Sequence, residues 1–363
     1  MRTDNRIMKI VRRISLALVA ILVLAVAGAL SYRAWWQHRI ANALRITSPN
    51  GIDEAKFIRV DGTDQWITIR GENKANPIIL FLHGGPSEAN SPFASLYRPF
   101  EKDYVFVQWD QPGAGKTYIK AGRHQPKFTL ESMAADGIAV VEYLHSELPG
   151  PKIILIGQDW GGLLGLQMIR QRPDLFAAFV GTGQIVSLFA QQEKQFEYTR
   201  SRAAARHDEK VLASLSQMGP PPYRSLEDYR RFGEYFEPVK PQEDLACEGR
   251  LTDLLAVTPS LSITDVYYWI KALRSGEELL NPTLMREDLL KTGGVFSVPI
   301  FFIQGGDDVI TPTSLVAEYV SEIQAPVKNL TIVPGAAHFV MWTRPAEFLG
   351  SLREDMRSTT AEH

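Results

Sequence analysis

Ile153-Ile-Leu-Ile-Gly-Gln-Asp-Trp-Gly-Gly-Leu-Leu-Gly165 is the stretch that decides the fold. It begins with an apolar run typical of a buried strand, passes through a Gly-x-Asp-x-Gly turn, and continues as a helix that opens at Trp160. Glycines on both sides of Asp159 allow the backbone to turn sharply there. The pattern therefore predicts that Asp159 projects from the end of a buried strand, where it is available for chemistry.

Short apolar runs recur along the chain, with segments of helical periodicity between them. The two runs on either side of Asp61-Gly62 predict an opening β-hairpin. Alternating strands and helices predict an α/β fold with a doubly wound, mostly parallel sheet, and such sheets bind ligands beyond the carboxyl ends of their strands. The predicted strands are 55–60, 65–70, 78–82, 104–109, 153–156, 176–181, 298–303 and 330–333.

The pattern changes in the middle of the chain, where charged helical segments and scattered aromatic residues replace the apolar runs. This change predicts a helical cap inserted into the sheet domain. We therefore expect four parts: a membrane anchor and juxtamembrane segment at 1–45, the first part of the core at 52–183, the cap at 184–295, and the second part of the core at 296–357.

The N-terminal segment has the pattern of a membrane anchor. Five basic residues precede an uncharged run from Ile14 to Leu30, which is about long enough to cross a bilayer, and Tyr32, Trp35 and Trp36 follow at the position of an interfacial aromatic belt. Positive charge before the run predicts a single-pass inner-membrane protein with its catalytic domain on the extracytoplasmic, periplasmic side. Ala25-Val-Ala27 supports the alternative of a cleaved signal peptide and secretion.

Composition narrows the class of partner. The chain has 363 residues with 39 Lys and Arg against 41 Asp and Glu, and this balance gives no indication of nucleic-acid binding. One cysteine, Cys247, permits neither an intramolecular disulfide nor a Cys-based metal site. No metal-ligand cluster is visible, and Gly113 to Thr117 lacks the spacing of a phosphate-binding loop. We expect a small-molecule substrate, no metal and no cofactor.

Three residues follow predicted strands in the order nucleophile, acid, histidine. They are Asp159, one of Asp307 and Asp308, and His338. Each has an ordinary structural reading when taken singly, since an Asp before a helix is often an N-cap and a lone His is often a packing residue. Their joint occurrence at strand ends, with His83-Gly-Gly-Pro86 in addition, favours a catalytic site.

From about residue 52 to 355 the chain resembles the α/β-hydrolase superfamily. The elbow at Asp159 is similar to that of epoxide hydrolases and haloalkane dehalogenases, which use an Asp nucleophile. The segments that begin at His83 and Asp110 are more similar to the proline iminopeptidase family, whose pattern is HGGPG with DQRGSG and whose nucleophile is Ser in a GxSWG elbow. Ser87, Pro112 and Asp159 depart from that second pattern.

Chemistry separates the two resemblances. A carboxylate that attacked an amide would form a mixed anhydride while expelling a poor amine leaving group. Attack on a saturated carbon that bears a halide or a strained epoxide oxygen forms an ordinary alkyl ester instead. The Asp at position 159 therefore argues against peptidase activity.

The resemblance implies a role for each residue of the site. Asp159 attacks the electrophilic carbon, and His338, oriented by Asp308, activates the water that hydrolyses the resulting ester. Asp308 is preferred because Gly305-Gly-Asp-Asp308 matches the Gly-x-x-Asp spacing of the superfamily, although Asp307 stays open. Backbone N–H groups of Gly85 and Trp160 are expected to form the oxyanion hole.

The leaving group is the least determined part of the prediction. Epoxide hydrolases use cap tyrosines, here Tyr223 with Tyr267 or Tyr268, and dehalogenases use the Trp after the nucleophile, here Trp160, with a second donor such as Trp269. We favour an epoxide hydrolase-like enzyme acting on an apolar electrophile. Three alternatives stay open: a haloalkane dehalogenase, a proline iminopeptidase-like peptidase or esterase whose Ser is replaced by Asp, and a non-catalytic ligand-binding homologue.

Overall fold

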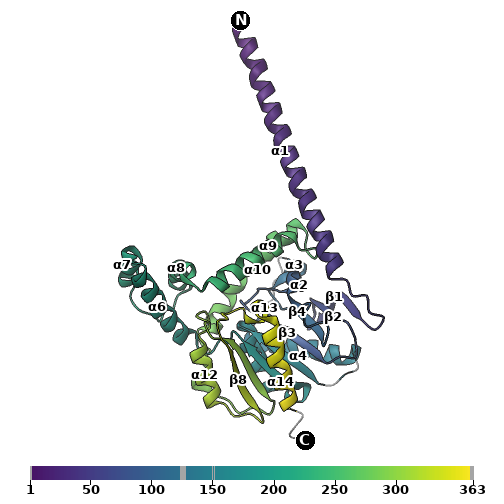
Figure 1. Ribbon diagram of the computed structural model, residues 1–363, viewed down its shortest axis with the longest axis vertical. Coiled ribbons are helices and arrows are strands. Elements are labelled where there is room, and N and C mark those ends of the chain that lie inside the picture. The colour runs from purple at the N-terminus through teal and green to yellow at the C-terminus, as the bar shows by residue number, and fades with distance from the viewer. Residues whose placement is uncertain (1, 123–127, 149, 151, 360–363) are drawn as a thin grey trace.

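An eight-stranded sheet in the order β1-β2-β4-β3-β5-β6-β7-β8 forms the centre of the computed structural model (Figure 1), which describes residues 2–122, 128–148, 150 and 152–359. β1 and β2 form the expected antiparallel hairpin, β2 pairs antiparallel with β4, and the other pairs are parallel. The predicted doubly wound, mostly parallel sheet is confirmed. The strands are β1 (Ile52–Val60), β2 (Thr63–Gly71), β3 (Ile78–Leu82), β4 (Val105–Asp110), β5 (Ile153–Gln158), β6 (Phe176–Thr182), β7 (Ile300–Gly305) and β8 (Lys328–Val333).

Helices cover both faces of the sheet, because its central strands bury side chains on both faces. Leu80 and Leu82 of β3 pack in one cluster with α4 (Leu130–Glu147), α5 (Trp160–Gln171) and α12 (Thr313–Glu322). Ile79 and Phe81 point the other way and pack with α14 (Pro345–Ser358). This alternation follows from the two-residue period of a strand. Three short helices complete this layer arrangement: α2 (Ala94–Tyr97), α3 (Gly115–Ala121) and α13 (Val340–Thr343).

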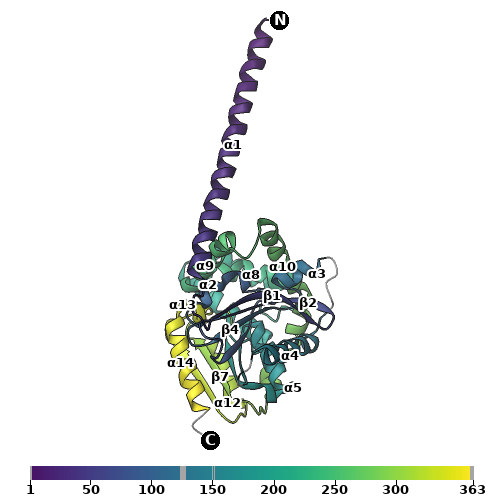
Figure 2. The ribbon, with the colours of Figure 1, turned by 90° about the vertical axis from the view of Figure 1, so that its right-hand side faces the viewer.

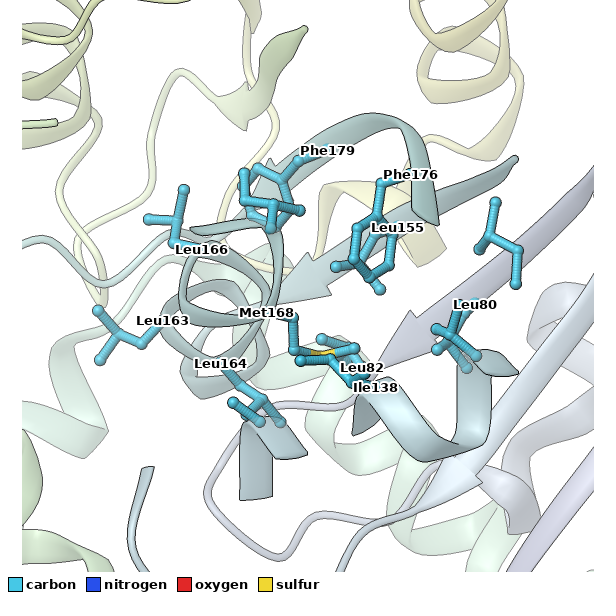
Figure 3. Packing of buried hydrophobic residues seen from close by; sticks show 14 of the residues in the cluster. Leu80, Leu82, Ile138, Leu155, Leu163, Leu164, Leu166, Met168, Phe176 and Phe179 are labelled. Atoms are coloured by element: carbon cyan, nitrogen blue, oxygen red, sulfur yellow. The ribbon is translucent and has the colours of Figure 1, made fainter. Parts of the chain in front are cut away.

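The helix after the elbow, α5, is held tightly against the sheet (Figure 3). Its Leu163, Leu164, Leu166 and Met168 are nearly fully buried beside leucines of β3 and β5. A Cβ placed on Gly165 would lie 2.4 Å from the Phe179 ring, so the helix approaches β6 as closely as a glycine permits. The packing fixes the first turn of α5, and therefore the position of the elbow.

The chain between β6 and β7 is helical throughout most of its length. Figure 1 shows α6, α7 and α8 to one side of the sheet, with α9 and α10 lying across it near the end of the N-terminal helix. Together these helices occupy the segment expected to form the cap. They are α6 (Leu188–Ala205), α7 (Glu209–Met218), α8 (Leu226–Phe236), α9 (Gln242–Val257), α10 (Ile263–Leu284) and α11 (Leu289–Thr292).

The N-terminal helix α1 (Arg2–Ala43) projects away from the sheet domain (Figure 2). The stretch Met8–Ala43 is long and apolar enough to cross a membrane, and its apolar window is not buried inside the structure. The last turns of α1 are attached to the cap: Arg33 donates to the carbonyls of Ala256 and Leu261 at 3.0 and 2.7 Å, and Gln37 donates to that of Thr258 at 2.8 Å.

Candidate active site

The elbow holds Asp159 in a backbone conformation that residues other than glycine rarely adopt. Its φ of 54° and ψ of −117° lie outside the common regions for non-glycine residues, and such strain costs about 1–3 kcal/mol. A Cβ on Gly157 would lie 2.4 Å from the carbonyl oxygen of Gly161, and one on Gly161 would lie 2.2 Å from that of Leu82. These positions accept only glycine, and the tight turn they permit pushes the Asp159 side chain out of the strand end.

Asp159 does not act as a helix cap. Although it precedes α5, its side chain accepts no hydrogen bond from the first turn of that helix. Its Oδ1 instead accepts a 2.9 Å hydrogen bond from the backbone N–H of Gly85, in the loop after β3. Trp160 is the first residue of α5, so its backbone N–H is one of the donors that a helix leaves unused at its start. Of the two predicted oxyanion donors, the N–H of Gly85 thus contacts the carboxylate directly.

Asp308 and His338 form a direct contact. His338 Nδ1–H donates to Asp308 Oδ2 over 3.0 Å, and Asp308 Oδ1 accepts from the backbone N–H groups of Ile310 and Thr311 at 2.9 Å each. The Thr311 hydroxyl donates to the same Asp308 Oδ2 at 2.8 Å. Asp307 is exposed, so the geometry selects Asp308 as the partner of the histidine. This arrangement leaves His338 Nε2 as the ring nitrogen available for proton transfer.

The His338 ring lies beside the elbow. A Cβ on Gly183 would be 2.6 Å from His338 Cε1, so the ring packs directly on Gly183. Gly183 follows Thr182 of β6, which pairs with Gln158, the residue before Asp159. Since paired strands are about 4.8 Å apart, histidine and carboxylate meet at neighbouring strand ends.

The surrounding carboxylates favour the charged form of His338. Burial acts to lower the pKa of this histidine, but the negative charge of Asp308 and its hydrogen bond, with further contributions from Asp159 and Asp244, raise the pKa to about 9. In the resting site the imidazole is therefore protonated near neutral pH. A proton must leave before His338 can serve as a base.

A cavity of about 620 Å³ opens over Asp159 and His338. Its wall is formed by the β3 loop, the elbow and the segment after β8 on one side and by α6, α8 and α9 on the other. The lining is mixed, with apolar residues such as Ile185 and Phe236 beside charged residues that include Glu88, Lys240 and Glu248. The carboxyl groups of Glu88 and Glu248 therefore line the same cavity as Asp159.

The aromatic cap residues expected to contact substrate lie elsewhere. The hydroxyl of Tyr223 donates to the carbonyl of Gly219 at 2.8 Å, and Tyr267 and Tyr268 are exposed on α10. Trp269 is buried and its indole N–H donates to the carbonyl of Ala89 at 3.1 Å. These four side chains are absent from the lining of the 620 Å³ cavity, so they are not placed to contact a substrate bound there.

The indole N–H of Trp160 is also engaged in a hydrogen bond away from the cavity. The side chain is fully buried, and its Nε1–H donates to Gln111 Oε1 at 3.1 Å. A halide site would require this donor to face the cavity, so the placement of Trp160 removes the main support for a dehalogenase. Its backbone N–H stays a predicted oxyanion donor.

Four charged residues near the site had no role in the sequence-based prediction. Glu88, Lys240 and Glu248 line the cavity, and Asp244 of α9 accepts a 2.9 Å hydrogen bond from the backbone N–H of His338. Glu88 follows the His-Gly-Gly-Pro segment by two residues, and that proximity was a usable signal. The other three come from the cap, and sequence spacing gave no indication of their contacts.

In the described parts of the chain there is no group of three or more His, Cys, Asp or Glu residues able to hold a metal ion. Cys247 is buried, and burial raises the pKa of its thiol to about 12. The side chain is a packing group on α9.

Comparison with known proteins agrees with the fold. Residues 77–345 match the model of the alpha/beta hydrolase fold family, so the chain belongs to that family. It is 26% identical over 306 residues to the probable aminopeptidase YbaC of Bacillus subtilis (strain 168), a match that covers 83% of this chain and 96% of the relative.

Solved structures share the fold at lower identity. A proline iminopeptidase-related protein from Thermus thermophilus is similar with a TM-score of 0.61 at 17% identity, over 85% of this chain and 98% of that one. A bacterial membrane phospholipase A gives 0.59 at 17%, over 96% and 99%. A variant of the Vigna radiata epoxide hydrolase gives 0.52 at 19%, over 84% and 99%. The protein is thus an α/β-hydrolase with peptidase, epoxide hydrolase and phospholipase relatives or neighbours.

Proposed function

We propose that the protein hydrolyses a substrate with an electrophilic carbon bonded to oxygen, of the epoxide type, through an ester with Asp159. One observation carries the proposal: Asp159 Oδ1 already accepts the hydrogen bond from the N–H of Gly85. One carboxylate oxygen is thus held in the oxyanion hole, and the other is left to attack. The same oxygen becomes the carbonyl oxygen of the ester, in the position where negative charge develops during hydrolysis.

In the first step the second oxygen of Asp159 forms a bond to the substrate carbon, and the carbon–oxygen bond of the ring breaks. The electron pair goes to the leaving oxygen, which takes up a proton. The product of this step is a neutral alkyl ester on Asp159. Orientation of the carboxylate by Gly85 reduces the entropic cost of attack.

In the second step His338 takes a proton from water, which attacks the carboxyl carbon of Asp159. Ester formation prepares the histidine for this role. The charge on Asp159 helps to raise the pKa of His338, so its neutralisation lowers that pKa. The imidazolium then gives its proton to solvent in the cavity, and His338 is free to act as a base. Collapse of the tetrahedral intermediate breaks the ester carbon–oxygen bond, and the leaving alkoxide takes the proton held by His338 to complete the diol. The Asp159 carboxyl releases its remaining proton as it returns to the carboxylate.

The Ser-to-Asp difference from the iminopeptidase pattern is the main reason not to propose the activity of the aminopeptidase relative. If the carboxylate at position 159 attacked an amide, it would form a mixed anhydride and would have to expel a poor amine leaving group. The test is turnover by the full chain in detergent, as wild type and as Asp159→Ser, with a panel of epoxides, haloalkanes, esters and N-terminal-proline amides. Epoxide opening by the wild type alone supports the proposal. Inert wild type with cleavage of esters or amides by Asp159→Ser contradicts it and indicates a peptidase-like hydrolase whose nucleophile is replaced.

We propose in addition that α1 anchors the enzyme in the inner membrane with the catalytic domain on the periplasmic side. The support is the unburied apolar stretch of α1 and the basic residues before it. Protease added to spheroplasts should degrade the domain without detergent. Protection of the domain contradicts the orientation, and a mature chain that begins after Ala27 indicates a cleaved signal.

A further inference from the structure

The aspartyl-ester mechanism leaves one role unfilled, because the leaving oxygen needs a proton and the predicted tyrosines do not line the cavity. We propose that Glu88 is a catalytic residue that donates this proton to the leaving oxygen when Asp159 attacks. The inference rests on the proposed function and assigns a further residue to the same site.

Glu88 lies against the same loop that holds the nucleophile. A Cβ on Gly84 would be 2.9 Å from Asp159 Cβ, and a Cβ on Gly85 would be 2.2 Å from Glu88 Cγ and 2.6 Å from its Cδ. The two side chains therefore touch successive glycines, whose Cα atoms are about 3.8 Å apart. Both line the same cavity, so a substrate carbon placed at Asp159 brings its leaving oxygen toward the Glu88 carboxyl.

The charges around Glu88 favour a carboxyl that carries a proton in the resting site. Its side chain is exposed toward the cavity. Partial desolvation by the surrounding protein, together with the negative charges of Asp159 and Glu248, raises the pKa of Glu88 to about 7, although His338 and Lys240 oppose the rise. Other charged groups on the cavity wall are Arg230, Glu234, Glu237 and Arg274.

Lys240, another cationic group on the cavity wall, is a poorer acid. Its ammonium is nearly fully buried and forms ion pairs with Glu237 and Glu248, each at 2.5 Å. Burial acts to lower the pKa of Lys240, but the two carboxylates outweigh it and the pKa is raised. Its protons are thus engaged with carboxylates, whereas the proton of Glu88 faces the cavity.

Proton transfer from Glu88 balances the first step. The Asp159–carbon bond forms, the ring carbon–oxygen bond breaks, and the oxygen receives the Glu88 proton to become a hydroxyl. Since Asp159 loses its charge in the same step, one of the contributions that raise the pKa of Glu88 disappears, and Glu88 becomes a carboxylate. Hydrolysis of the ester by water later leaves one proton in the site. This proton returns to Glu88 when the Asp159 carboxylate is restored.

The test measures ester formation on Asp159 in single turnover. The His338→Gln background is used because it blocks hydrolysis of the ester, and the added mass is followed on the peptide that carries Asp159. The variants are Glu88→Gln, Glu88→Asp and Tyr229→Phe, the last because Tyr229 also lines the cavity. The probes are a terminal alkyl epoxide and an epoxide with a trifluoromethyl substituent, whose alkoxide is a weaker base.

We expect Glu88→Gln to slow ester formation from the alkyl epoxide roughly 100-fold or more, with a smaller loss for the trifluoromethyl epoxide. Glu88→Asp should recover part of the rate. With Glu88 present, the rate should fall as the pH rises through the pKa of its carboxyl, and this fall should vanish in Glu88→Gln. A purely structural role would not produce the leaving-group difference or the change in pH profile.

Two results overturn the inference. Equal rates of ester formation with and without Glu88, or a loss only in Tyr229→Phe, remove Glu88 from catalysis while the aspartyl-ester mechanism stands. Absence of any ester from His338→Gln with either epoxide removes the proposed function, and the inference with it. The two failures are therefore distinguishable.

Discussion

The backbone N–H of His338 donates a 2.9 Å hydrogen bond to Oδ1 of Asp244, a residue in the first turn of cap helix α9. The neighbouring Glu243 accepts from the N–H of Ala337 at 2.6 Å. The cap therefore holds the histidine segment directly by two carboxylates. We therefore expect a movement of α9 to shift the segment that carries His338.

Replacement of Asp244 separates this hydrogen bond from the charge. Asp244→Ala leaves the N–H of His338 without its acceptor, which costs about 1–3 kcal/mol, so thermal unfolding should shift down by several degrees and kcat should fall. Asp244→Asn keeps an oxygen acceptor and removes only the charge. It should retain stability while lowering the pKa of His338, since Asp244 contributes to the raised value. Equal effects of both variants on stability would contradict a hydrogen-bonding role.

Stability should depend on pH through His338. Its pKa in the folded chain, about 9, is above the ordinary value of 6.5. The protonated imidazole therefore contributes stability that is fully present below pH 6.5 and is lost as the pH rises through 9. Melting temperatures of wild type and His338→Gln, measured across this range, should converge at high pH. A difference that grows with pH would contradict the raised pKa.

Displacement of the Gly85 N–H, the predicted oxyanion donor, should lower kcat strongly. Gly85 has a φ of 87°, and a Cβ there would collide with the Glu88 side chain. Gly85→Ala should displace the N–H from Asp159, and removal of one such donor typically lowers kcat about 10²–10³-fold. Gly62→Ala is the matched control, because Gly62 has a φ of 74° with no atom near its Cβ position. Thermal unfolding should show some loss of stability in both variants, larger for Gly85→Ala because of the collision, and steady-state kinetics should show a loss of activity only for Gly85→Ala.

The fold was largely predictable because it depends on local patterns. Wholly apolar runs identified the buried strands, and the glycines around Asp159 identified the elbow, where a side chain cannot replace them. The choice of Asp308 over Asp307 followed from spacing and agrees with their burial. The cavity wall was not predictable in this way, because Lys240 and Asp244 reach the site through contacts that span the inserted helices.

The positions of the cap tyrosines could not be predicted from the sequence either. An aromatic residue in an amphipathic cap helix has no sequence signal that tells whether it faces the cavity, a neighbouring helix or solvent. Tyr223 packs on Phe232 and donates to the backbone, while Tyr267 contacts Tyr268 at the surface. Tyr229 on α8, which no motif singled out, is the one that lines the cavity among these four.

Two polar side chains near the end of α1 attach it to the cap. Arg33 and Gln37 donate to carbonyls at the end of α9 and in the segment after it, so Arg33→Ala with Gln37→Ala leaves these acceptors to water and should loosen the C-terminal end of α9. We expect faster proteolysis at residues 256–261 and a lower melting temperature, with membrane association unchanged because the apolar stretch is intact. Arg39→Ala is the control, since Arg39 lies over the rings of Trp35 and Trp36 within its own helix. Limited proteolysis of detergent-solubilised protein checks the result; equal cleavage in the double variant and the control would show that α1 does not stabilise the cap.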